Sequence, residues 1–348
     1  MPLEDINNFV FYPAQDSADK GRLYVLGEQT SYCENSFVLI PYQNPSVSPP
    51  APKYFPIQEL REIVLEPNKN PKQPVPLKPR YTREQYVEKI KKIKEHIQYG
   101  NIYEINFCMD YVAEAAEFDP VSTFIRLQQK ANAPYAALVK LGKEYILCAS
   151  PELFLKKQNT SLITKPIKGT ARRGKTPEED EQLKHQLQNS LKERTENVMA
   201  VDVARNDLSI IAERASVKVD TLFGIESFAT VHQMVSTVSC QVKPGTHFED
   251  IIKATFPMAS MTGAPKTMAM NLISEFEDFD RKYYSGSFGI LDEQGDFELN
   301  VVIRSIFYNA ESKQLSFAVG GAITYLSDPD QEYEECLLKA ENLLRVLG

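Results

Sequence analysis

The sequence predicts a mixed α/β (α+β) protein, and three observations support this prediction. Runs rich in β-branched and aromatic residues, such as residues 9–12 and 36–40, are typical of strands. Segments with helix-capping residues follow them: Thr82 begins a capping-box pattern, and Asp119 and Thr176 each precede a proline at the first helical position. Hydrophobic residues make up 43% of the 348 positions, so the chain can bury a sizeable core.

The expected elements alternate along the chain, from a strand-rich start to a capped last helix. In order, we expect strands and turns over residues 1–65 with proline-dense connectors at 45–56 and 67–79, a helix from 82 to 100, a strand after it, a helix from 119 to 131, strands at 135–141, 145–149 and 153–156, a helix from 176, a strand at 228–238, a helix that opens within 256–266, strands from 284 and at 300–305, and a helix from 328. Long β-runs interleaved with capped helices are consistent with a packed α/β core.

The overall charge and the cysteine pattern argue against several classes of protein. The net charge of -8 and a pI near 5.3 argue against binding to nucleic acid or to an acidic membrane surface. No apolar run reaches the ~18 residues of a membrane helix, and residues 1–5 lack the basic and apolar pattern of a leader. The cysteines are scattered, which suits reduced thiols rather than a disulfide frame or a zinc site. We therefore expect a cytoplasmic protein.

The most informative stretch is the loop of residues 164–170, which follows an apolar run and precedes a basic one. Pro166 fixes one backbone angle, and Gly169 permits a conformation closed to other residues. Lys168 therefore lies at a defined point between them. A lysine amine is a nucleophile only when it is deprotonated, and burial or a cationic neighbour lowers its pKa toward that state. A lysine in such a turn is more often solvated, so the stretch alone leaves both interpretations open.

Several motifs after residue 80 resemble those of the chorismate-utilising enzymes. Residues 166–170, Pro-Ile-Lys-Gly-Thr, resemble the PIKGT motif of the aminodeoxychorismate synthase component I family. Anthranilate synthase is similar, but it has alanine where this chain has Lys168. Further blocks match in the expected order: Ser-Pro-Glu at 150–152, E-x-x-E-N-x-M at 193–199, V-D-x-x-R-N-D-L at 201–208 and S-x-T-G-A-P-K at 260–266.

The resemblance implies both a fold and a division of the chain. The family's architecture has two large, mostly antiparallel sheets packed in one core, with helices outside and a pocket between the sheets. We expect residues 81–348 to form this chorismate-binding catalytic domain, with residues 1–80 as a strand- and proline-rich segment packed on the core. The first 80 residues match the family weakly, and we find no tryptophan-feedback motif in them.

By resemblance, four residues carry the chemistry. Lys168 would attack the ring of chorismate, and Glu152 would be the acid that protonates the departing hydroxyl, a task that partial burial favours. His232 matches a family histidine near the ring hydroxyl, although an isolated histidine in a strand is more often structural. Thr262 lies near an expected helix start, where free N–H groups bind anions such as a dicarboxylate substrate.

The resemblance also implies a set of substrate-binding residues. Tyr284 and Arg304 would hold a substrate carboxylate, because the planar fork of an arginine binds both oxygens. Gly320 and Gly321 match a family glycine turn at the end of a strand. Lys339 shares one face of the last helix with two glutamates and is placed in the same set.

Glu104 departs from the family pattern, which usually has glutamine at this position. The isochorismate and salicylate synthase relatives carry a lysine there, which serves as the base that activates water. The absence of that lysine argues against water as the nucleophile. The role of Glu104 stays open between substrate binding and a strand glutamate that faces solvent.

Two pairs of glutamates form a candidate metal site. Glu193 and Glu196 are three residues apart on one expected helix, and Glu332 and Glu335 are three apart on another. If the helices meet, their carboxylates could surround Mg²⁺, which favours oxygen ligands. The chain has 47 acidic residues, so such spacing is common on solvated helix faces, and only the family match favours the metal.

Taken with the resemblance, these residues predict an enzyme that converts chorismate and ammonia to 4-amino-4-deoxychorismate, on the route to p-aminobenzoate and folate. A separate glutamine amidotransferase subunit is expected to supply the ammonia, because no glutaminase-like nucleophile elbow is found in this chain. Anthranilate synthase component I is the nearest alternative, followed by isochorismate or salicylate synthase. A non-catalytic chorismate-binding protein is an alternative of another class.

Overall fold

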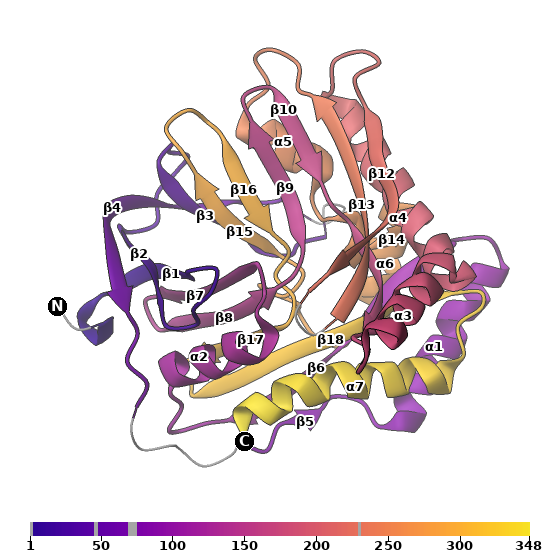
Figure 1. Cartoon of the computed structure of the whole chain (residues 1–348), viewed down its shortest axis with the longest axis horizontal. Coiled ribbons are helices and arrows are strands. Elements are labelled where there is room, and N and C mark those ends of the chain that lie inside the picture. The colour runs from indigo at the N-terminus through magenta and orange to yellow at the C-terminus, as the bar shows by residue number, and fades with distance from the viewer. Residues whose placement is uncertain (1–2, 45–47, 69–74, 229–230) are drawn as a thin grey trace.

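The computed structural model describes residues 3–44, 48–68, 75–228 and 231–348 and contains two antiparallel sheets flanked by helices (Figure 1). One long strand, β4 (Lys53–Val64), belongs to both sheets: its first residues pair with β3, and the part from Ile57 onward pairs with β2. The shared strand therefore joins the two sheets at one edge. The expectation of two large antiparallel sheets in one core is confirmed.

The first sheet contains the strands nearest to the C-terminal helix. In spatial order it runs β4, β2 (Lys20–Leu26), β1 (Asn8–Pro13), β7 (Tyr135–Leu141), β8 (Glu144–Ser150), β17 (Ser305–Asn309), β18 (Gln314–Thr324) and β6 (Glu104–Glu114), and β6 also pairs with β5 (Lys78–Pro79) and β14 (Gly263–Ala264). Most of β6 is buried, because its sheet neighbours and α6 cover it, and Tyr86 of α1 packs against Phe107. Its first residue, Glu104, pairs with Ala264 on one side and Thr324 on the other.

The second sheet contains the strand that carries Lys168. In spatial order it runs β4, β3 (Ser36–Ile40), β15 (Ser287–Leu291), β16 (Phe297–Asn300), β9 (Leu153–Gln158), β10 (Ser161–Thr164) and β13 (Val231–Gln241), and β13 also pairs with β11 (Ile167–Arg172) and β12 (Lys218–Ser227). The register of β11 against β13 shifts between Ile167 and Thr170. This irregularity falls at Lys168 and Gly169, so the pairing opens where the motif lies.

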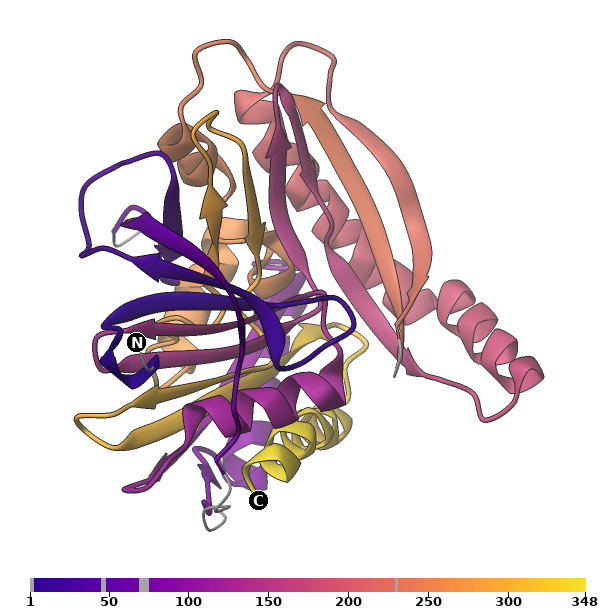
Figure 2. The same cartoon turned by 60° about the vertical axis from the view of Figure 1, so that its left-hand side comes forward.

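The helices begin where the capping residues predict. They are α1 (Arg83–Gln98), α2 (Pro120–Ala131), α3 (Pro177–Asn189), α4 (Leu191–Ile211), α5 (Phe248–Thr255), α6 (Lys266–Phe276) and α7 (Pro329–Leu347). Thr82 makes the expected capping box, and the Asp119, Thr176 and Asp328 side chains each accept a hydrogen bond from the first turn. Helices α1 and α7 pack together beside β18, whereas α4 lies along β11 and β13 (Figures 1 and 2).

Three local expectations are wrong. The helix expected within residues 256–266 begins only at Lys266, after a 3-10 turn (Ala259–Met261) and the short strand β14. Residues 300–305 do not form one strand, because β16 ends at Asn300 and β17 begins at Ser305. Likewise β15 begins at Ser287 rather than at Tyr284.

Strands from residues 1–80 take part in both sheets, since β1 pairs with β7 and β3 pairs with β15. The division at residue 80 stays a prediction. Parts of the two proline-dense connectors and of the strand expected at 228–238 lie outside the described residues, as does the start of the chain. Pro56, expected in a connector, lies in β4 instead.

All five cysteines are free thiols. In the described part of the chain, no helix combines the length and apolarity needed to cross a bilayer.

Candidate active site

The site forms around an ion pair that crosses from one sheet to the other. The Nζ atom of Lys168, on β11, lies 2.5 Å from Oε1 of Glu104, the first residue of β6. Only 7% of the Lys168 side chain and 3% of the Glu104 side chain are exposed. The two interpretations in which Lys168 is solvated or Glu104 faces solvent are therefore wrong. Glu104 contacts the amine itself.

Gly169 allows a helix to approach the strand that carries Lys168. Its φ of +86 lies in the left-handed region that favours glycine. A Cβ atom at this position would stand 2.8 Å from Oε2 of Glu193 on α4. Any larger residue would therefore be strained by this φ and would force the Glu193 side chain to move. The glycine of the PIKGT motif thus leaves room for the Glu193 side chain beside the strand that carries Lys168.

Lys168 is an ammonium group in this environment, which corrects the expectation that its pKa is lowered. Burial by itself lowers the pKa of the amine, but the carboxylates of Glu104 and Glu196, and more weakly Glu152, outweigh burial and raise it. Among the described residues, Glu104 is the one group that forms a hydrogen bond or ion pair with the amine. The lysine must therefore lose a proton before it can act as a nucleophile.

Glu152 lies in the turn between β8 and β9 and is 4% exposed. Burial raises the pKa of its carboxyl group to about 7, against the opposing effects of the Ile167 N–H, Lys168 and Arg304. The N–H of Ile167 donates to Oε1 of Glu152 over 3.5 Å. This hydrogen bond links the Ser-Pro-Glu turn directly to the strand that carries Lys168. A carboxyl group with this pKa can hold a proton near neutral pH and donate it.

Arg304 directly precedes β17 and has an unusual backbone conformation, with φ of +50. Its carbonyl accepts from the Ala149 N–H over 3.3 Å, which fastens the backbone to the end of β8. Burial lowers the pKa of the guanidinium, and the Glu152 carboxylate opposes this. Within the described part of the chain, the guanidinium makes no hydrogen bond or ion pair. Its donors are therefore available to an anion beside Glu152.

The four candidate metal-binding glutamates are brought together by α4 and α7, around a lysine. Nζ of Lys192 lies 3.4 Å from a carboxylate oxygen of Glu332, 3.9 Å from Glu335 and 4.0 Å from Glu196. Burial raises the pKa of Glu196 to about 8, and burial also raises that of Glu193. Oε1 of Glu196 is buried without a hydrogen bond. As the described side chains stand, no three acidic, histidine or cysteine residues converge closely enough to hold a metal.

The glycines and the lysine expected to bind substrate border the same carboxylates. Gly320 and Gly321 lie within β18 rather than in a turn. A Cβ atom at Gly321 would lie 3.3 Å from Oε2 of Glu332, so this glycine faces the glutamates. The amine of Lys339 donates to the Gly320 carbonyl over 2.8 Å and pairs with Glu335 over 2.7 Å. Lys339 therefore fastens α7 to β18 at the glutamate cluster.

Three predicted residues make their contacts elsewhere. The ring nitrogens of His232 hydrogen bond to Ser227 over 2.8 Å and to Asp180 over 3.0 Å. The hydroxyl of Thr262 donates to the carbonyl of Met258 over 3.1 Å. The Tyr284 hydroxyl lies 3.8 Å from the sulfur of Cys108. None of these contacts joins Lys168 or Glu152, so the roles of His232, Thr262 and Tyr284 stay predictions.

Lys192 and two buried amides were not found by sequence reasoning. The side-chain nitrogen of Asn197 and the side-chain oxygen of Gln233 are buried without hydrogen bonds. Asn197 follows Glu196 within the E-x-x-E-N block, which is the signal that could have indicated it. Lys192 gave no comparable signal, because a lysine beside a glutamate is common on a helix surface.

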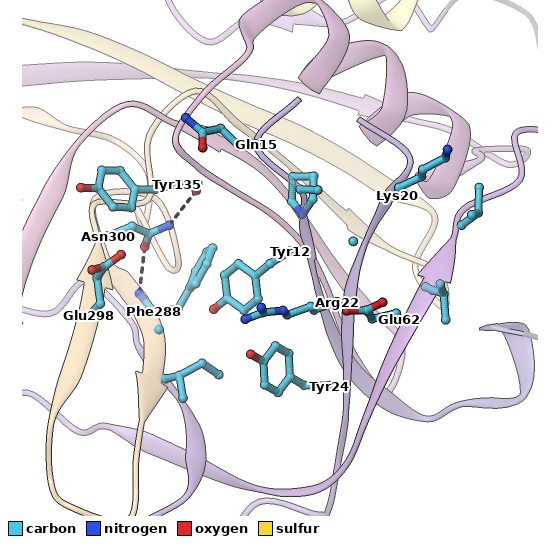
Figure 3. Close-up of a pocket in the computed structure, with 17 residues that line it drawn as sticks. Tyr12, Gln15, Lys20, Arg22, Tyr24, Glu62, Tyr135, Phe288, Glu298 and Asn300 are labelled. Carbon is cyan, nitrogen blue, oxygen red and sulfur yellow. Dashed lines mark hydrogen bonds between the residues drawn. The ribbon is translucent and has the colours of Figure 1, made fainter. Parts of the chain in front are cut away.

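One cavity of the structure lies away from these residues (Figure 3). Its volume is about 820 Å³, and Tyr12, Arg22, Tyr24, Tyr135 and Phe288 line part of it. A much smaller cavity, of about 20 Å³, borders Glu152, Pro166 and Ser260.

Comparisons with known proteins show the family of the chain. Residues 22–345 match the family described as chorismate binding enzyme. The chloroplastic aminodeoxychorismate synthase of Arabidopsis thaliana is 41% identical over 75% of this chain and 28% of its own length. Aminodeoxychorismate synthase component 1 of Escherichia coli K12 is 38% identical over 76% of this chain and 58% of its own length. The chain thus spans less than two thirds of these relatives.

A solved structure shows the same fold. Anthranilate synthase component I from Streptococcus pneumoniae superposes with a TM-score of 0.78 at 23% identity, over 91% of this chain and 82% of that one. Since the family match extends over most of the sequence, the chain belongs to the chorismate-binding enzymes.

Proposed function

We propose that the protein is an aminodeoxychorismate synthase component I, which converts chorismate and ammonia to 4-amino-4-deoxychorismate. The observation that carries this proposal is the buried Lys168 amine, held between the two sheets within hydrogen-bonding distance of Glu104. A lysine in that place can bond covalently to a substrate carbon, which the alanine of anthranilate synthase cannot do. The relatives from Arabidopsis thaliana and Escherichia coli described above are both named aminodeoxychorismate synthases.

The proposed mechanism uses two residues in sequence. The deprotonated amine of Lys168 attacks C2 of the chorismate ring, and the C4 hydroxyl leaves as water with a proton from Glu152. Ammonia then adds at C4, and the bond between C2 and Lys168 breaks. The pKa of about 7 suits Glu152 to this task, because it holds a proton at neutral pH and can release it in the transition state.

Arg304 is proposed to hold a substrate carboxylate. Its guanidinium lies near the Glu152 carboxyl and makes no hydrogen bond among the described residues. A planar guanidinium binds both oxygens of a carboxylate, and this fixes the orientation of the ring as well as its position. The proposed orientation places C4 of the ring toward the acid and C2 toward the amine.

Magnesium is proposed as the cofactor, held by Glu193, Glu196, Glu332 and Glu335. The donor chemistry fits, because all four residues offer carboxylate oxygens and one oxygen of Glu196 is buried without a hydrogen bond. When bound, the ion supplies positive charge to the ring carboxylate of the substrate. Lys192 neutralises part of the same cluster in the structure described here.

The ammonia is proposed to come from a separate glutamine amidotransferase. The name of the Escherichia coli relative, component 1, implies a further component in that protein. The proposed partner would deliver ammonia to the site without contact with solvent, so that the ammonia would not be protonated to ammonium. Free ammonium salts at alkaline pH supply the same nucleophile and permit a test with this chain alone.

The proposal is tested by the product formed from chorismate, an ammonium salt and Mg²⁺. We expect 4-amino-4-deoxychorismate, which keeps its enolpyruvyl group, and no release of pyruvate. Formation of fluorescent anthranilate with pyruvate would identify an anthranilate synthase instead. Chorismate binding without turnover would identify a non-catalytic protein.

The covalent role is tested by Lys168→Ala. We expect the variant to fold and to lose amination, because no other lysine forms a hydrogen bond with Glu104 among the described residues. The matched control is Lys165→Ala, three positions earlier, whose amine forms a partly exposed ion pair with Glu226 over 3.0 Å. A Lys168→Ala variant with normal amination would refute covalent catalysis.

A further inference from the structure

The proposed nucleophile begins the reaction in the wrong protonation state. The Lys168 amine is buried and forms an ion pair with the carboxylate of Glu104 over 2.5 Å, which requires the protonated amine. An ammonium group has no lone pair, so a base must take this proton before the amine can bond to carbon. The base must lie within hydrogen-bonding reach of Nζ.

Glu104 is the group that meets this condition. Its Oε1 lies 2.5 Å from Nζ of Lys168, and among the described residues neither side chain makes a second hydrogen bond. None of the four candidate metal-binding glutamates forms an ion pair with Lys168 at the distances observed. The carboxyl group of Glu152 is engaged by the Ile167 N–H.

The position of Glu104 is fixed by the strands around it. As the first residue of β6 it pairs with Ala264 of β14 and Thr324 of β18. Two neighbouring strands therefore hold its backbone, and burial limits the freedom of its side chain. A base held in this way is already aligned with the amine, without a conformational change.

We propose that Glu104 is the proton acceptor of Lys168, and that it returns the proton when the lysine leaves the substrate. This inference rests on the proposed function, because it concerns the same lysine. The usual family residue at this position, glutamine, has an amide that cannot accept a proton at neutral pH. Glu104 therefore gives this chain a proton acceptor that the glutamine relatives lack at this place.

The proton and bond changes balance over the whole reaction. In the first step the N–H bond of the ammonium breaks and an O–H bond forms on Glu104, so that the ion pair becomes a neutral pair. The amine bonds to C2 while the C4 hydroxyl departs as water with the proton of Glu152. After ammonia adds at C4, its excess proton passes to Glu152. The C2–N bond breaks, and the departing amine recovers the proton held on Glu104.

The buried setting favours this transfer over release of the proton to water. A charged pair out of water is costly unless its geometry and hydrogen bonds are complete. This pair has a single hydrogen bond, so the transfer of its proton breaks no other hydrogen bond of either side chain. The same setting prevents exchange of the proton with solvent, since both side chains are nearly unexposed.

The experiment measures how fast chorismate bonds to the enzyme when ammonia is absent. Rapid-quench intact-mass spectrometry follows the species whose mass gain equals chorismate minus one water. We expect Glu104→Gln to slow its formation by about 10²-fold or more, the usual contribution of a positioned acid or base. Glu104→Asp should recover part of this rate, because it keeps a carboxylate. The matched control is Glu114→Gln, the same substitution at the exposed far end of β6, which should change nothing.

The outcomes separate this inference from the proposed function. An adduct rate in folded Glu104→Gln equal to that of the unmodified protein would overturn the inference, as would amination without any adduct. A second outcome separates the two proposals. If the unmodified protein forms the adduct, Glu104→Gln forms it more slowly, and the product that is released carries no amino group, the proposed function fails while the role of Glu104 stands. If Glu104→Gln does not fold, Glu104→Asp provides the test, because its shorter side chain moves the carboxylate away from the Lys168 amine. An adduct rate in Glu104→Asp equal to that of the unmodified protein would then contradict the proton transfer.

Discussion

Two buried ion pairs that contact β6, Arg281 with Glu277 and Lys168 with Glu104, differ in how completely they are bonded. Arg281 donates to both oxygens of Glu277, over 2.6 and 2.8 Å, and also to the carbonyls of Met261 and Asn106. The N–H of Cys108 adds a hydrogen bond to Glu277. The pair of Lys168 and Glu104 has one hydrogen bond and no other partner among the described residues.

The difference separates a structural ion pair from a reactive one. When every donor and acceptor is satisfied, as at Arg281, neither charge can be removed without leaving buried groups unpaired. Where one hydrogen bond joins two otherwise unbonded groups, as at Lys168, a proton can move without loss of other bonds. The two pairs are also connected, because Arg281 holds the Asn106 carbonyl two residues beyond Glu104. The structural pair therefore helps to position β6, the strand that carries Glu104.

The largest effect on stability is expected from Arg281→Met. This change leaves the Glu277 carboxylate buried without its partner, which costs about 3–5 kcal/mol in the free energy of unfolding. Urea denaturation followed by circular dichroism measures it. Lys168→Met is the matched comparison: it should abolish amination with a smaller loss of stability, because one hydrogen bond is removed rather than several. An equal loss in both variants would contradict the distinction.

Glu152→Gln should lower kcat for amination by about 10²-fold or more, because the amide cannot donate the proton that the departing hydroxyl needs. In the unmodified protein, kcat/KM should fall as pH rises through about 7, where the Glu152 carboxyl loses its proton. A pH profile of the two proteins measures this, and the variant should lack the decline due to this group.

The same raised pKa has a consequence for stability. The protonated form of Glu152 is favoured in the folded state relative to the unfolded chain. Its contribution is therefore fully present below the unfolded-state pKa and is lost as pH rises through about 7. Denaturation midpoints for the unmodified protein and Glu152→Gln should diverge in their pH dependence across this window. Parallel curves would show that Glu152 is not buried as described.

Addition of Mg²⁺ should raise the melting temperature by a few degrees, because an ion that binds only the folded state stabilises it. Glu196→Gln should reduce this response, since Glu196 supplies a buried oxygen that has no hydrogen bond. Glu95→Gln, an exposed position on α1, is the control and should respond like the unmodified protein. Differential scanning calorimetry with and without the ion distinguishes them. A full response in Glu196→Gln would remove this residue from the proposed ligand set.

The smallest effect is expected from an exposed ion pair. Lys92 and Glu88 on α1 lie 2.9 Å apart, as close as many buried partners. Solvent screens their attraction, so Lys92→Ala should leave the urea midpoint unchanged within error. A clear loss of stability in this variant would mean that distance alone, rather than burial and bonding, controls the strength of these pairs.

Helix starts were the part of the fold that local sequence predicted well. Thr82, Asp119, Thr176 and Asp328 each cap a helix, because a capping side chain bonds to N–H groups within the next three residues. The failures lie at sites where distant segments meet. Arg304 leaves the expected strand with a positive φ as its carbonyl accepts from Ala149, a contact between distant segments. No local pattern contains that contact.

The sequence by itself determined the motifs, the helix caps and the membership of the family, because these depend on residue identities at short spacing. Only the tertiary structure decided the charge on Lys168 and the partner that holds it. Glu104 lies 64 positions earlier in the chain and belongs to the other sheet. The pKa of an amine depends on the burial and on the charges that folding gathers around it. Those surroundings do not exist until the two sheets pack.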